Sequence, residues 1–593
     1  MGSITITING QTVQAQTGQT VLEAARSAGI DIPTLCHHPA VKPIGACRLC
    51  MVEIAGQRTL QPACTFPVAD KLDVKTESPR VVEVRKFVME LIFTERNHFC
   101  MYCEMSGDCE LQALAYRYGI DHMTYPTYVK RYPVDASPSF FLLDHNRCVL
   151  CRRCVRVCGE LVANHTLDMR QRGASTMVHA DMNLPLGQSS CISCGNCLDV
   201  CPTGALVDKR SAFMARNAQT EHVRSVCSQC SLGCGIDVLT RAGYLLRVQG
   251  DPEAPVNRGL LCRKGRFDPL HEKRERLLDP LVRIRDGHRK VDWDEALQTA
   301  AERIRRTPAS KVGVLASTQA TNEALYQLAR LFVDELKAGK AGLLHPVVPV
   351  LSDKLPASLE EIAKSDCVLV VGADPVQDHP VASFFVKRAL DAEGRVIVVG
   401  APTSPLADLA DESLGMEEIR KAAETVRAAS RPAVLYGAGL PERVLDELKA
   451  LAGKALLLPL QPGVNTFAAA KFGLDRIADP AGVDVLFVLA GEEDLEDGIL
   501  RKIGTETFLI VQGCYGSSLA DRADVVLPMA AWAERSGTLT NTAGLVQEVR
   551  AATDAAGNSK PDWEILSLLA GRLGIKPDAS LEEIGVHASR QLQ

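Results

Sequence analysis

Two runs of closely spaced cysteines offer the most specific chemistry in the chain. Both have the spacing C-x2-C-x2-C-x3-C; the runs are Cys148, Cys151, Cys154 and Cys158, and Cys191, Cys194, Cys197 and Cys201. In paired [4Fe–4S] clusters with this spacing, the fourth cysteine of each run binds the other cluster. Three close thiolates wrap three corners of a cubane, and the fourth, on a following turn, reaches across. The spacing therefore predicts two such clusters.

By this rule the two ligand sets are Cys148, Cys151, Cys154 and Cys201, and Cys191, Cys194, Cys197 and Cys158. Structural zinc knuckles are the alternative, because C-x2-C pairs also bind zinc. Zinc sites rarely supply four cysteines in so short a run, twice, with proline behind the last, so the spacing favours iron–sulfur. Residues 140–210 resemble a two-cluster bacterial ferredoxin. The 32 residues between Cys158 and Cys191 exceed the separation in a minimal ferredoxin and form an insertion without an assigned role.

The size and composition indicate an ordinary soluble globular protein of several domains. The chain has 593 residues, 46% hydrophobic and 23% charged residues, and a net charge of −6, which gives no reason to expect nucleic acid or an anionic membrane as a partner. No export signal and no apolar run of about 18 residues is present, so we expect a cytoplasmic protein without a membrane span. In a reducing compartment, the 21 cysteines indicate metal binding rather than disulfides.

Residues 1–79 would position four further cysteines. We expect two short strands around the turn Asn9-Gly10 and a helix near residues 21–29, before the spacing C-x10-C-x2-C-x13-C of Cys36, Cys47, Cys50 and Cys64. The segment resembles the N-terminal [2Fe–2S] domain of the complex I large iron–sulfur subunit and of NAD-linked hydrogenases and formate dehydrogenases. The resemblance implies a β-grasp fold and one [2Fe–2S] cluster on these four cysteines. We interpret His37 and His38 as neighbours of this cluster rather than ligands.

Residues 80–125 begin with an amphipathic helix and then offer only Cys100, Cys103 and Cys109. The same families carry here a [4Fe–4S] cluster held by one histidine and three cysteines, which implies His98 as the fourth ligand. The commonest family spacing, H-x3-C, would place the histidine where Arg96 stands, whereas this chain has H-x-C. A three-cysteine site, or no cluster, is the alternative. An imidazole ligand should raise the reduction potential of the cluster.

Residues 222–275 contain a fifth set, and the predicted ligands are Cys227, Cys230, Cys234 and Cys262. With the ending Cys262-Arg-Lys264-Gly265, the segment resembles the [4Fe–4S] domain of the molybdopterin oxidoreductase family. In active members the lysine lies between the cluster and the pterin, which makes Lys264 a candidate cofactor-binding residue; a positive charge beside an anionic cluster is the equal alternative. The five sets use nineteen cysteines and His98, for one [2Fe–2S] and four [4Fe–4S] clusters. Cys367 and Cys514 remain, and we interpret both as core residues.

Residues 276–593 alternate helical runs with short apolar runs, which predicts parallel sheets covered by helices. The fold class is thus multi-domain α+β followed by α/β. This region resembles the molybdopterin oxidoreductase domain but lacks three of its features: the catalytic cysteine segment after Ala316, the arginine and threonine pair after Val399, and a β-barrel after about residue 575. We expect a degenerate scaffold without molybdopterin. The lone G-x-G pattern of Gly437 and Gly439 fits a tight strand-to-helix turn better than a nicotinamide site.

The resemblance implies an electron-transfer subunit of a multi-subunit NAD(P)-linked oxidoreductase, with no catalytic residues of its own. The expected partners are a flavin- and NAD(P)-binding subunit, a small [2Fe–2S] subunit and a hydrogenase or other catalytic module. Both ferredoxin motifs are whole, whereas the corresponding region of the complex I subunit usually keeps one cubane, because its second motif has largely lost its cysteines. This favours a hydrogenase-type assembly, with electron bifurcation as one form of it, over complex I. Two further hypotheses are a formate dehydrogenase catalytic subunit with its own molybdenum- or tungsten-pterin, and an assembly protein with structural clusters.

Overall fold

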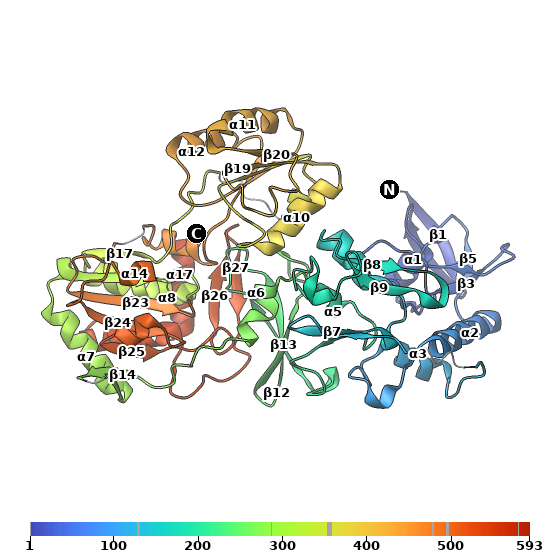
Figure 1. Cartoon of the computed structure of the whole chain (residues 1–593), viewed down its shortest axis with the longest axis horizontal. Coiled ribbons are helices and arrows are strands. Elements are labelled where there is room, and N and C mark those ends of the chain that lie inside the picture. Colours follow the sequence, from blue (N-terminus) through green and yellow to red (C-terminus); the bar gives the residue numbers. More distant parts are fainter. Residues whose placement is uncertain are drawn as a thin grey trace. The chain divides into compact units, whose positions relative to one another are not determined.

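The computed structural model describes residues 2–126, 131–285, 287–352, 358–476, 479–493, 497–578 and 580–592. The chain forms two compact units, Met1–Thr220 and Glu221–Gln593 (Figure 1). Within the described ranges, no helix combines the length and the apolar character that crossing a bilayer requires.

The first unit begins with a five-stranded mixed sheet in the order β2-β1-β5-β3-β4. Its elements are β1 (Ser3–Ile8), β2 (Gln11–Gln16), α1 (Val21–Ser27), β3 (Met51–Ile54), β4 (Gln61–Pro62) and β5 (Asp73–Lys75). The predicted hairpin and helix are both present. Helix α1 starts at a capping box, in which Thr20 and Glu23 bond each other's backbone amides at 3.2 and 2.7 Å. Its apolar face packs on the sheet in one core with Cys50 and Cys64.

A helical segment follows, with α2 (Pro79–Glu95), the short helix η1 (Cys100–Tyr102) and α3 (Glu110–Tyr118). The fully buried Arg85 fastens α2 to the preceding sheet. Its guanidinium donates to the carbonyl oxygens of Leu49 and Met51, both at 2.9 Å, and to Glu77 and the Tyr118 hydroxyl, both at 2.8 Å. The loop that carries Cys47 and Cys50 is thereby attached to the helices around Cys100 to Cys109.

The remainder of the first unit contains the two cysteine runs. A three-stranded sheet in the order β10-β7-β6 lies beside short helices: β6 (Val134–Asp135), β7 (Phe141–Asp144), α4 (Arg153–Arg156), η3 (Val157–Leu161), α5 (Asn196–Asp199) and β10 (Leu206–Asp208). The insertion between the runs folds as an antiparallel hairpin of β8 (Leu167–Arg170) and β9 (Met177–Ala180). Four short helices complete the first unit: η2 (His145–Arg147), η4 (Gly173–Ser175), η5 (Leu186–Gln188) and η6 (Asn217–Gln219).

The second unit opens with an antiparallel sheet, β11 (Glu221–Val226), β12 (Gly235–Arg241) and β13 (Tyr244–Gly250), followed by α6 (Arg263–Arg266) and η7 (Asp268–Leu270). Strands β12 and β13 pair antiparallel. The four cysteines of this region precede β12 and α6, so the sheet brings their loops to one end.

A seven-stranded sheet in the order β15-β14-β25-β24-β23-β16-β17 forms the larger core of this unit. Its strands are β14 (Leu281–Ile284), β15 (Gly287–Lys290), β16 (Val312–Ala316), β17 (Lys340–Leu343), β23 (Val485–Gly491), β24 (Phe508–Gly513) and β25 (Val525–Pro528). Strands β14 and β15 pair antiparallel at one edge, which the expectation of purely parallel sheets did not include. The covering helices are α7 (Trp293–Arg306), α8 (Asn322–Ala329), η9 (Arg330–Glu335), α13 (Thr466–Lys471), α14 (Asp497–Leu500), α15 (Ser518–Arg522), α16 (Asp562–Leu573) and α17 (Leu581–Leu592).

A second, wholly parallel sheet is inserted between β17 and β23, in the order β20-β19-β18-β21-β22. It consists of β18 (Cys367–Val371), β19 (Arg395–Val399), β20 (Glu412–Leu414), β21 (Pro432–Tyr436) and β22 (Leu456–Pro459), with α9 (Leu359–Ala363), α10 (Pro380–Asp391), α11 (Ile419–Ala428) and α12 (Glu442–Lys449). A hairpin of β26 (Gly537–Thr540) and β27 (Val546–Val549) completes the unit, with η8 (Ala309–Lys311) and η10 (Met416–Glu418). Cys367 and Cys514 both lie in hydrophobic cores, as interpreted from the sequence.

The turn after β21 shows why glycines stand there. A Cβ atom on Gly437 would lie 2.3 Å from the carbonyl oxygen of Gly372, and Gly439 has a φ of +71°. Close packing of two backbones and a left-handed turn account for both glycines.

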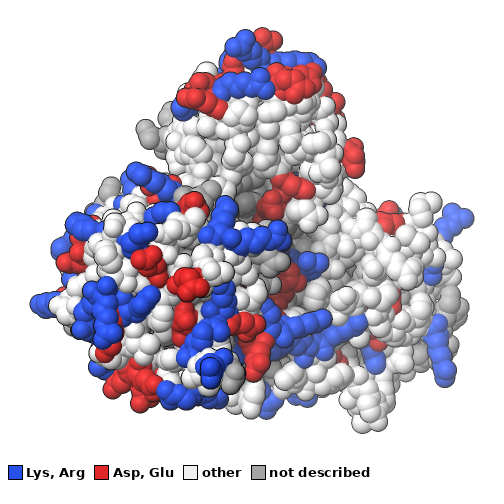
Figure 2. All heavy atoms as spheres, turned by 60° about the vertical axis from the view of Figure 1, so that its left-hand side comes forward, with Lys and Arg blue, Asp and Glu red and all other residues white. Residues whose placement is uncertain are grey.

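On the face visible in Figure 2, positive and negative side chains are interspersed.

Candidate metal centres

The first cysteine set lies in the loop between α1 and β3 and in the turn after β4. The amide of Cys36 donates to the Cys47 sulfur at 3.4 Å, and the amide of Cys47 donates to the Cys36 sulfur at 3.5 Å. Cys50 and Cys64 also contact each other and are 1% exposed. Hydrogen bonds from Cys47 and Cys64 lower the pKa of Cys36 to about 2. Amides directed at sulfur stabilise thiolate charge, as cluster ligands require.

The two histidines beside this set bond to groups other than the sulfurs. The Nδ1 atom of His37 lies 3.2 Å from the Arg26 guanidinium, and that of His38 accepts from the amide of Ala40 at 3.3 Å. Burial and the nearby Arg26 lower the pKa of His37 to about 4, so its ring is neutral at pH 7. This arrangement agrees with their interpretation as neighbours.

A cavity in the first unit is lined by His98, Cys100, Cys103 and Cys109 together. The Nε2 atom of His98 is buried without a hydrogen-bond partner among the described residues. Burial, with Arg147 and Arg96 nearby, lowers the pKa of His98 to about 4, which keeps the imidazole neutral. A neutral imidazole with a free lone pair in a cavity of thiols is a metal-ligand donor set. The rings of Phe93 and His98 pack edge to face, with 5.6 Å between their centres.

Arg96, which stands at the commonest family position for the histidine, is engaged elsewhere. It is 2% exposed, donates to the carbonyl oxygen of His145 at 2.7 Å and to that of Thr176, and lies 4.2 Å from the ring centre of Tyr132. The shift from H-x3-C to H-x-C therefore leaves an arginine in a structural role and moves the imidazole two residues along.

The same cavity has no room for a side chain at Gly204. A Cβ atom on Gly204 would lie 2.5 Å from the sulfur of Cys103. Real Cβ atoms essentially never approach so closely, so a side chain at position 204 would force the Cys103 sulfur or the backbone to shift. Gly204 therefore keeps open the space that Cys103 occupies.

The two runs exchange their fourth cysteines in space. Burial and the neighbouring Cys151, Cys148 and Cys201 raise the pKa of Cys154 well above its usual range. In the other set, one cavity is lined by Cys158, Cys191, Cys194 and Cys197. Cys201 therefore lies with the first run and Cys158 with the second, which is the grouping that the spacing predicts.

The fifth set is gathered in the second unit. Burial raises the pKa of Cys230 to about 12, despite the opposing charge of Lys264. Burial, and the charges of Cys230 and Cys262, raise the pKa values of Cys227 and Cys234 well above the usual range. Lys264 lies close enough to this set, and to Asp378, to influence both. It thus stands beside the cysteines, where either of its two interpretations places it.

Burial raises the pKa of Cys148 and of Cys109 to about 11, so without a metal both thiols are protonated at pH 7. Iron binding must displace these protons. Among the residues that the structure describes, no three His, Cys, Asp or Glu side chains are arranged around a single ion. In a [4Fe–4S] cluster each iron takes one protein ligand, and in a [2Fe–2S] cluster each iron takes two, so four ligands are spread over several irons rather than gathered around one ion as at a zinc site. The five sets fit clusters.

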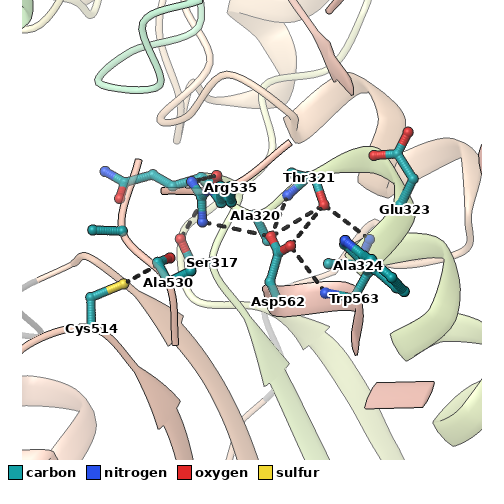
Figure 3. A network of polar contacts seen from close by, with 12 residues as sticks. Ser317, Ala320, Thr321, Glu323, Ala324, Cys514, Ala530, Arg535, Asp562 and Trp563 are labelled. Carbon is teal, nitrogen blue, oxygen red and sulfur yellow. Dashed lines mark hydrogen bonds and ion pairs between the residues drawn. The ribbon is translucent and has the colours of Figure 1, made fainter. Parts of the chain in front are cut away.

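The carboxyl edge of the seven-stranded sheet allows a test for a pterin, because open α/β sheets bind ligands there. Arg535 and Asp562, 2% and 0% exposed, form an ion pair at 3.6 Å (Figure 3). The amide of Thr321 donates to Asp562 at 2.9 Å, and Arg535 donates to the carbonyl oxygen of Gln319 at 2.8 Å. The thiol of Cys514 donates to Ala530 at 3.5 Å. The chain's own side chains thus bond to one another at this part of the edge.

Sequence reasoning missed two buried arginines beside the cysteines. Arg153 and Arg156 lie on α4, inside the first run, and are 5% and 7% exposed. The available signal was their spacing: three residues apart, they share a face of a helix. Charged residues are almost never fully buried unless paired, so sequence alone favoured a solvated position for both.

Comparison with known proteins gives consistent matches along the chain. Family models match as follows: 2Fe-2S iron-sulfur cluster binding domain at residues 2–79, NADH-ubiquinone oxidoreductase-G iron-sulfur binding region at 85–124, NADH-quinone oxidoreductase subunit 3 ferredoxin-like domain at 139–207, molybdopterin oxidoreductase Fe4S4 domain at 220–270, and molybdopterin oxidoreductase at 276–572.

Three relatives match nearly the whole chain. NADH-quinone oxidoreductase subunit 3 of Thermus thermophilus is 30% identical, over 97% of this chain and 83% of its own length. The mitochondrial NADH-ubiquinone oxidoreductase 78 kDa subunit of Candida albicans is 26% identical, over 97% and 83%. NADPH-Fe(3+) oxidoreductase subunit alpha of Geobacter sulfurreducens is 28% identical, over 96% and 81%.

Proposed function

This chain belongs to the family of the large iron–sulfur subunits of NADH-quinone oxidoreductase, and from that premise we propose that it relays electrons between a flavin- and NAD(P)-binding subunit and a second catalytic module. It is an iron–sulfur electron-transfer subunit of an oxidoreductase complex. The proposal adds five clusters, one [2Fe–2S] and four [4Fe–4S], and a small [2Fe–2S] subunit as a further partner. We also propose a reducing compartment, where thiols remain available as ligands instead of forming disulfides.

The proposed ligands are the five sets described above: Cys36, Cys47, Cys50 and Cys64; His98, Cys100, Cys103 and Cys109; Cys148, Cys151, Cys154 and Cys201; Cys158, Cys191, Cys194 and Cys197; Cys227, Cys230, Cys234 and Cys262. The observation that carries the proposal is the unpartnered, buried Nε2 atom of His98 in a cavity lined by three cysteines. A buried polar atom without a partner is costly, so a ligand for it is the simplest explanation.

The clusters, when bound, supply one-electron carriers. This chain's residues fix their positions, bury them and tune them. The amides of Cys36 and Cys47 direct hydrogen bonds at sulfur, and His98 offers a neutral nitrogen where a thiolate would bring charge. Hydrogen-bond donors to sulfur and neutral ligands both favour the reduced state of the cluster that they surround.

The identity of the second module is a separate proposal. Two whole ferredoxin motifs favour a hydrogenase-type assembly, whereas two of the relatives described above are named as subunits of NADH-quinone or NADH-ubiquinone oxidoreductase. A catalytic subunit with its own molybdenum- or tungsten-pterin is disfavoured, because the buried pair of Arg535 and Asp562 occupies part of the edge where open α/β sheets bind ligands.

Oxygen-protected purification of the native complex tests these proposals together. We expect about eighteen irons per chain, from one two-iron and four four-iron clusters, and far less than one molybdenum or tungsten. Partner masses then decide between a hydrogenase and a quinone-reducing module. Far fewer irons would contradict the electron-relay proposal, and stoichiometric molybdenum or tungsten would contradict the proposal that the chain binds no pterin.

A further inference from the structure

We infer that Arg156 is a positioning residue that joins two of the cluster sites and holds a fixed positive charge between them. The two sites are the set of Cys36, Cys47, Cys50 and Cys64 and the set of Cys148, Cys151, Cys154 and Cys201. The inference rests on the proposed function, because it assigns both sets to clusters.

The contacts of Arg156 carry the inference. Its Nη2 atom donates to the carbonyl oxygen of Cys36 and, at 3.5 Å, to that of Cys151. One nitrogen atom thus bonds to a ligand residue of each set. Its Nη1 atom donates to the carbonyl oxygen of Lys42 at 2.5 Å, and its Nε atom donates to that of Arg152 at 3.3 Å. The planar guanidinium can reach these directions at once, which a single ammonium group cannot.

A second bond holds the same loop. The amide of Lys42 donates to a carboxylate oxygen of Glu160 at 2.8 Å. Glu160 lies in η3, directly after α4. The loop between Cys36 and Cys47 is therefore fastened at Lys42 to both Arg156 and Glu160, on the segment that carries the first cysteine run.

The charge of Arg156 has no carboxylate partner among the described residues. The side chain is 7% exposed, its four hydrogen-bond partners are neutral carbonyl oxygens, and no acidic oxygen lies within ion-pair distance in the described ranges. A buried charge is costly unless an opposite charge compensates it. Four thiolates around iron and sulfide leave each cluster site with net negative charge, so two loaded sites on either side supply that compensation.

Two effects on electron transfer follow. Added electrons increase the negative charge of either site, so a nearby fixed cation favours reduction of both. The bridge also holds the two ligand residues at a fixed separation. In the transfer step one site loses an electron and the other gains it; no bond breaks and no proton moves, because arginine stays protonated.

The test compares Arg156→Gln, Arg156→Lys and the control Arg152→Gln in the full chain within its purified complex. Arg152 is an exposed neighbour of Cys151, so its replacement removes the same charge without the bridge. Three quantities are measured: iron per chain, the midpoint potentials of both sites, and the microwave power that half-saturates the [2Fe–2S] signal while the neighbouring cluster is paramagnetic.

For Arg156→Gln we expect wild-type iron, lower potentials at both sites and a several-fold lower half-saturation power, because the clusters interact less. Arg156→Lys keeps the charge but loses the double bridge, so its potentials should stay near wild type while its half-saturation power falls. Arg152→Gln should match wild type in both quantities.

Unchanged potentials and saturation in Arg156→Gln with full iron would overturn the inference. If that variant loses its clusters, Arg156→Lys decides: wild-type saturation would refute the bridge, and a reduced value would support it. A wild-type complex without these two signals would instead contradict the proposed function, which separates the two failures.

Discussion

His98 shows how a single side chain can set the electronic character of a site. Its ring is neutral and buried and lines one cavity with three thiols, and burial is the main cause of its low pKa. The ring offers nitrogen where the other predicted cubane sets offer a fourth sulfur.

Replacing the ring by a thiol tests this. His98→Cys should keep the cluster but lower its midpoint potential, because a thiolate adds the negative charge that imidazole lacks. Potentiometric titration followed by electron paramagnetic resonance measures the change. His122→Cys is the control, since His122 is exposed in the same module and bonds to Asp121. An unchanged potential in His98→Cys would show that His98 is not a ligand.

Gly204 allows a test by one methyl group. Gly204→Ala should displace the Cys103 sulfur, because the new Cβ atom would lie 2.5 Å from it. We expect loss of the cubane signal of this set, with the [2Fe–2S] signal retained. Gly571→Ala, where a Cβ atom meets nothing within 4 Å, should leave every signal intact. Full iron in Gly204→Ala would contradict the assignment of Cys103.

At the scale of elements, α4 connects two neighbouring segments. Arg153 donates through both terminal nitrogens to Glu110, at 2.6 and 2.8 Å, and so ties α4 to the start of α3. Arg153 is buried, whereas the Glu110 side chain is 46% exposed. Solvent therefore weakens the pair, but both bonds are charge-assisted and bidentate.

Glu110→Gln should lower the free energy of unfolding by about 2 kcal/mol, since one charged partner of a buried guanidinium is lost. Thermal or denaturant unfolding of the first unit in the purified protein measures it. Glu83→Gln on α2 is the control, because the Glu83 side chain forms no hydrogen bond or ion pair among the described residues. A loss equal to that of the control would mean that the pair contributes nothing.

His379, at the start of α10, predicts a dependence of stability on pH. Its Nε2 atom lies 2.9 Å from the Ser231 hydroxyl and 3.0 Å from the carbonyl oxygen of Gln461. Burial, with a smaller contribution from Lys264, lowers its pKa to about 4, so folding favours the neutral ring. Its stabilisation is present above the ordinary pKa of about 6.5 and is lost as the pH falls toward 4.

The loss should approach about 3 kcal/mol. Unfolding temperatures of wild type and His379→Gln, measured between pH 7 and pH 4, test this: the difference between the two proteins should shrink on acidification. A constant difference would contradict the role of His379.

At the scale of the whole molecule, the cysteine sets should be separable. Cys103→Ala should remove one cubane signal and leave the [2Fe–2S] signal, because Cys103 lines the cavity of its own set. Iron analysis and electron paramagnetic resonance of the same sample measure both. Simultaneous loss of the two signals would indicate misfolding instead.

The cysteine groupings could be predicted because ligand spacing is local: the grouping of Cys148 with Cys201 follows from two short motifs. The strands after residue 276 were equally readable, since buried parallel strands are continuous apolar runs. The roles of Arg153 and Arg156 could not be predicted, because their partners lie 43 and 120 residues away. The antiparallel edge of β14 and β15 and the pair of Arg535 and Asp562 likewise depend on contacts distant in sequence.

The crossing of Cys158 and Cys201 constrains the order of biosynthesis. As the chain leaves the ribosome, the first three thiols of the leading run wait for a partner 47 residues behind Cys154, beyond the entire hairpin of β8 and β9. Cys158, by contrast, is made before Cys191, Cys194 and Cys197, the three cysteines with which it is proposed to bind a cluster. On the proposed ligand assignment, neither four-thiolate site is complete before Cys201 is made, so completion of both clusters must follow the synthesis of that residue.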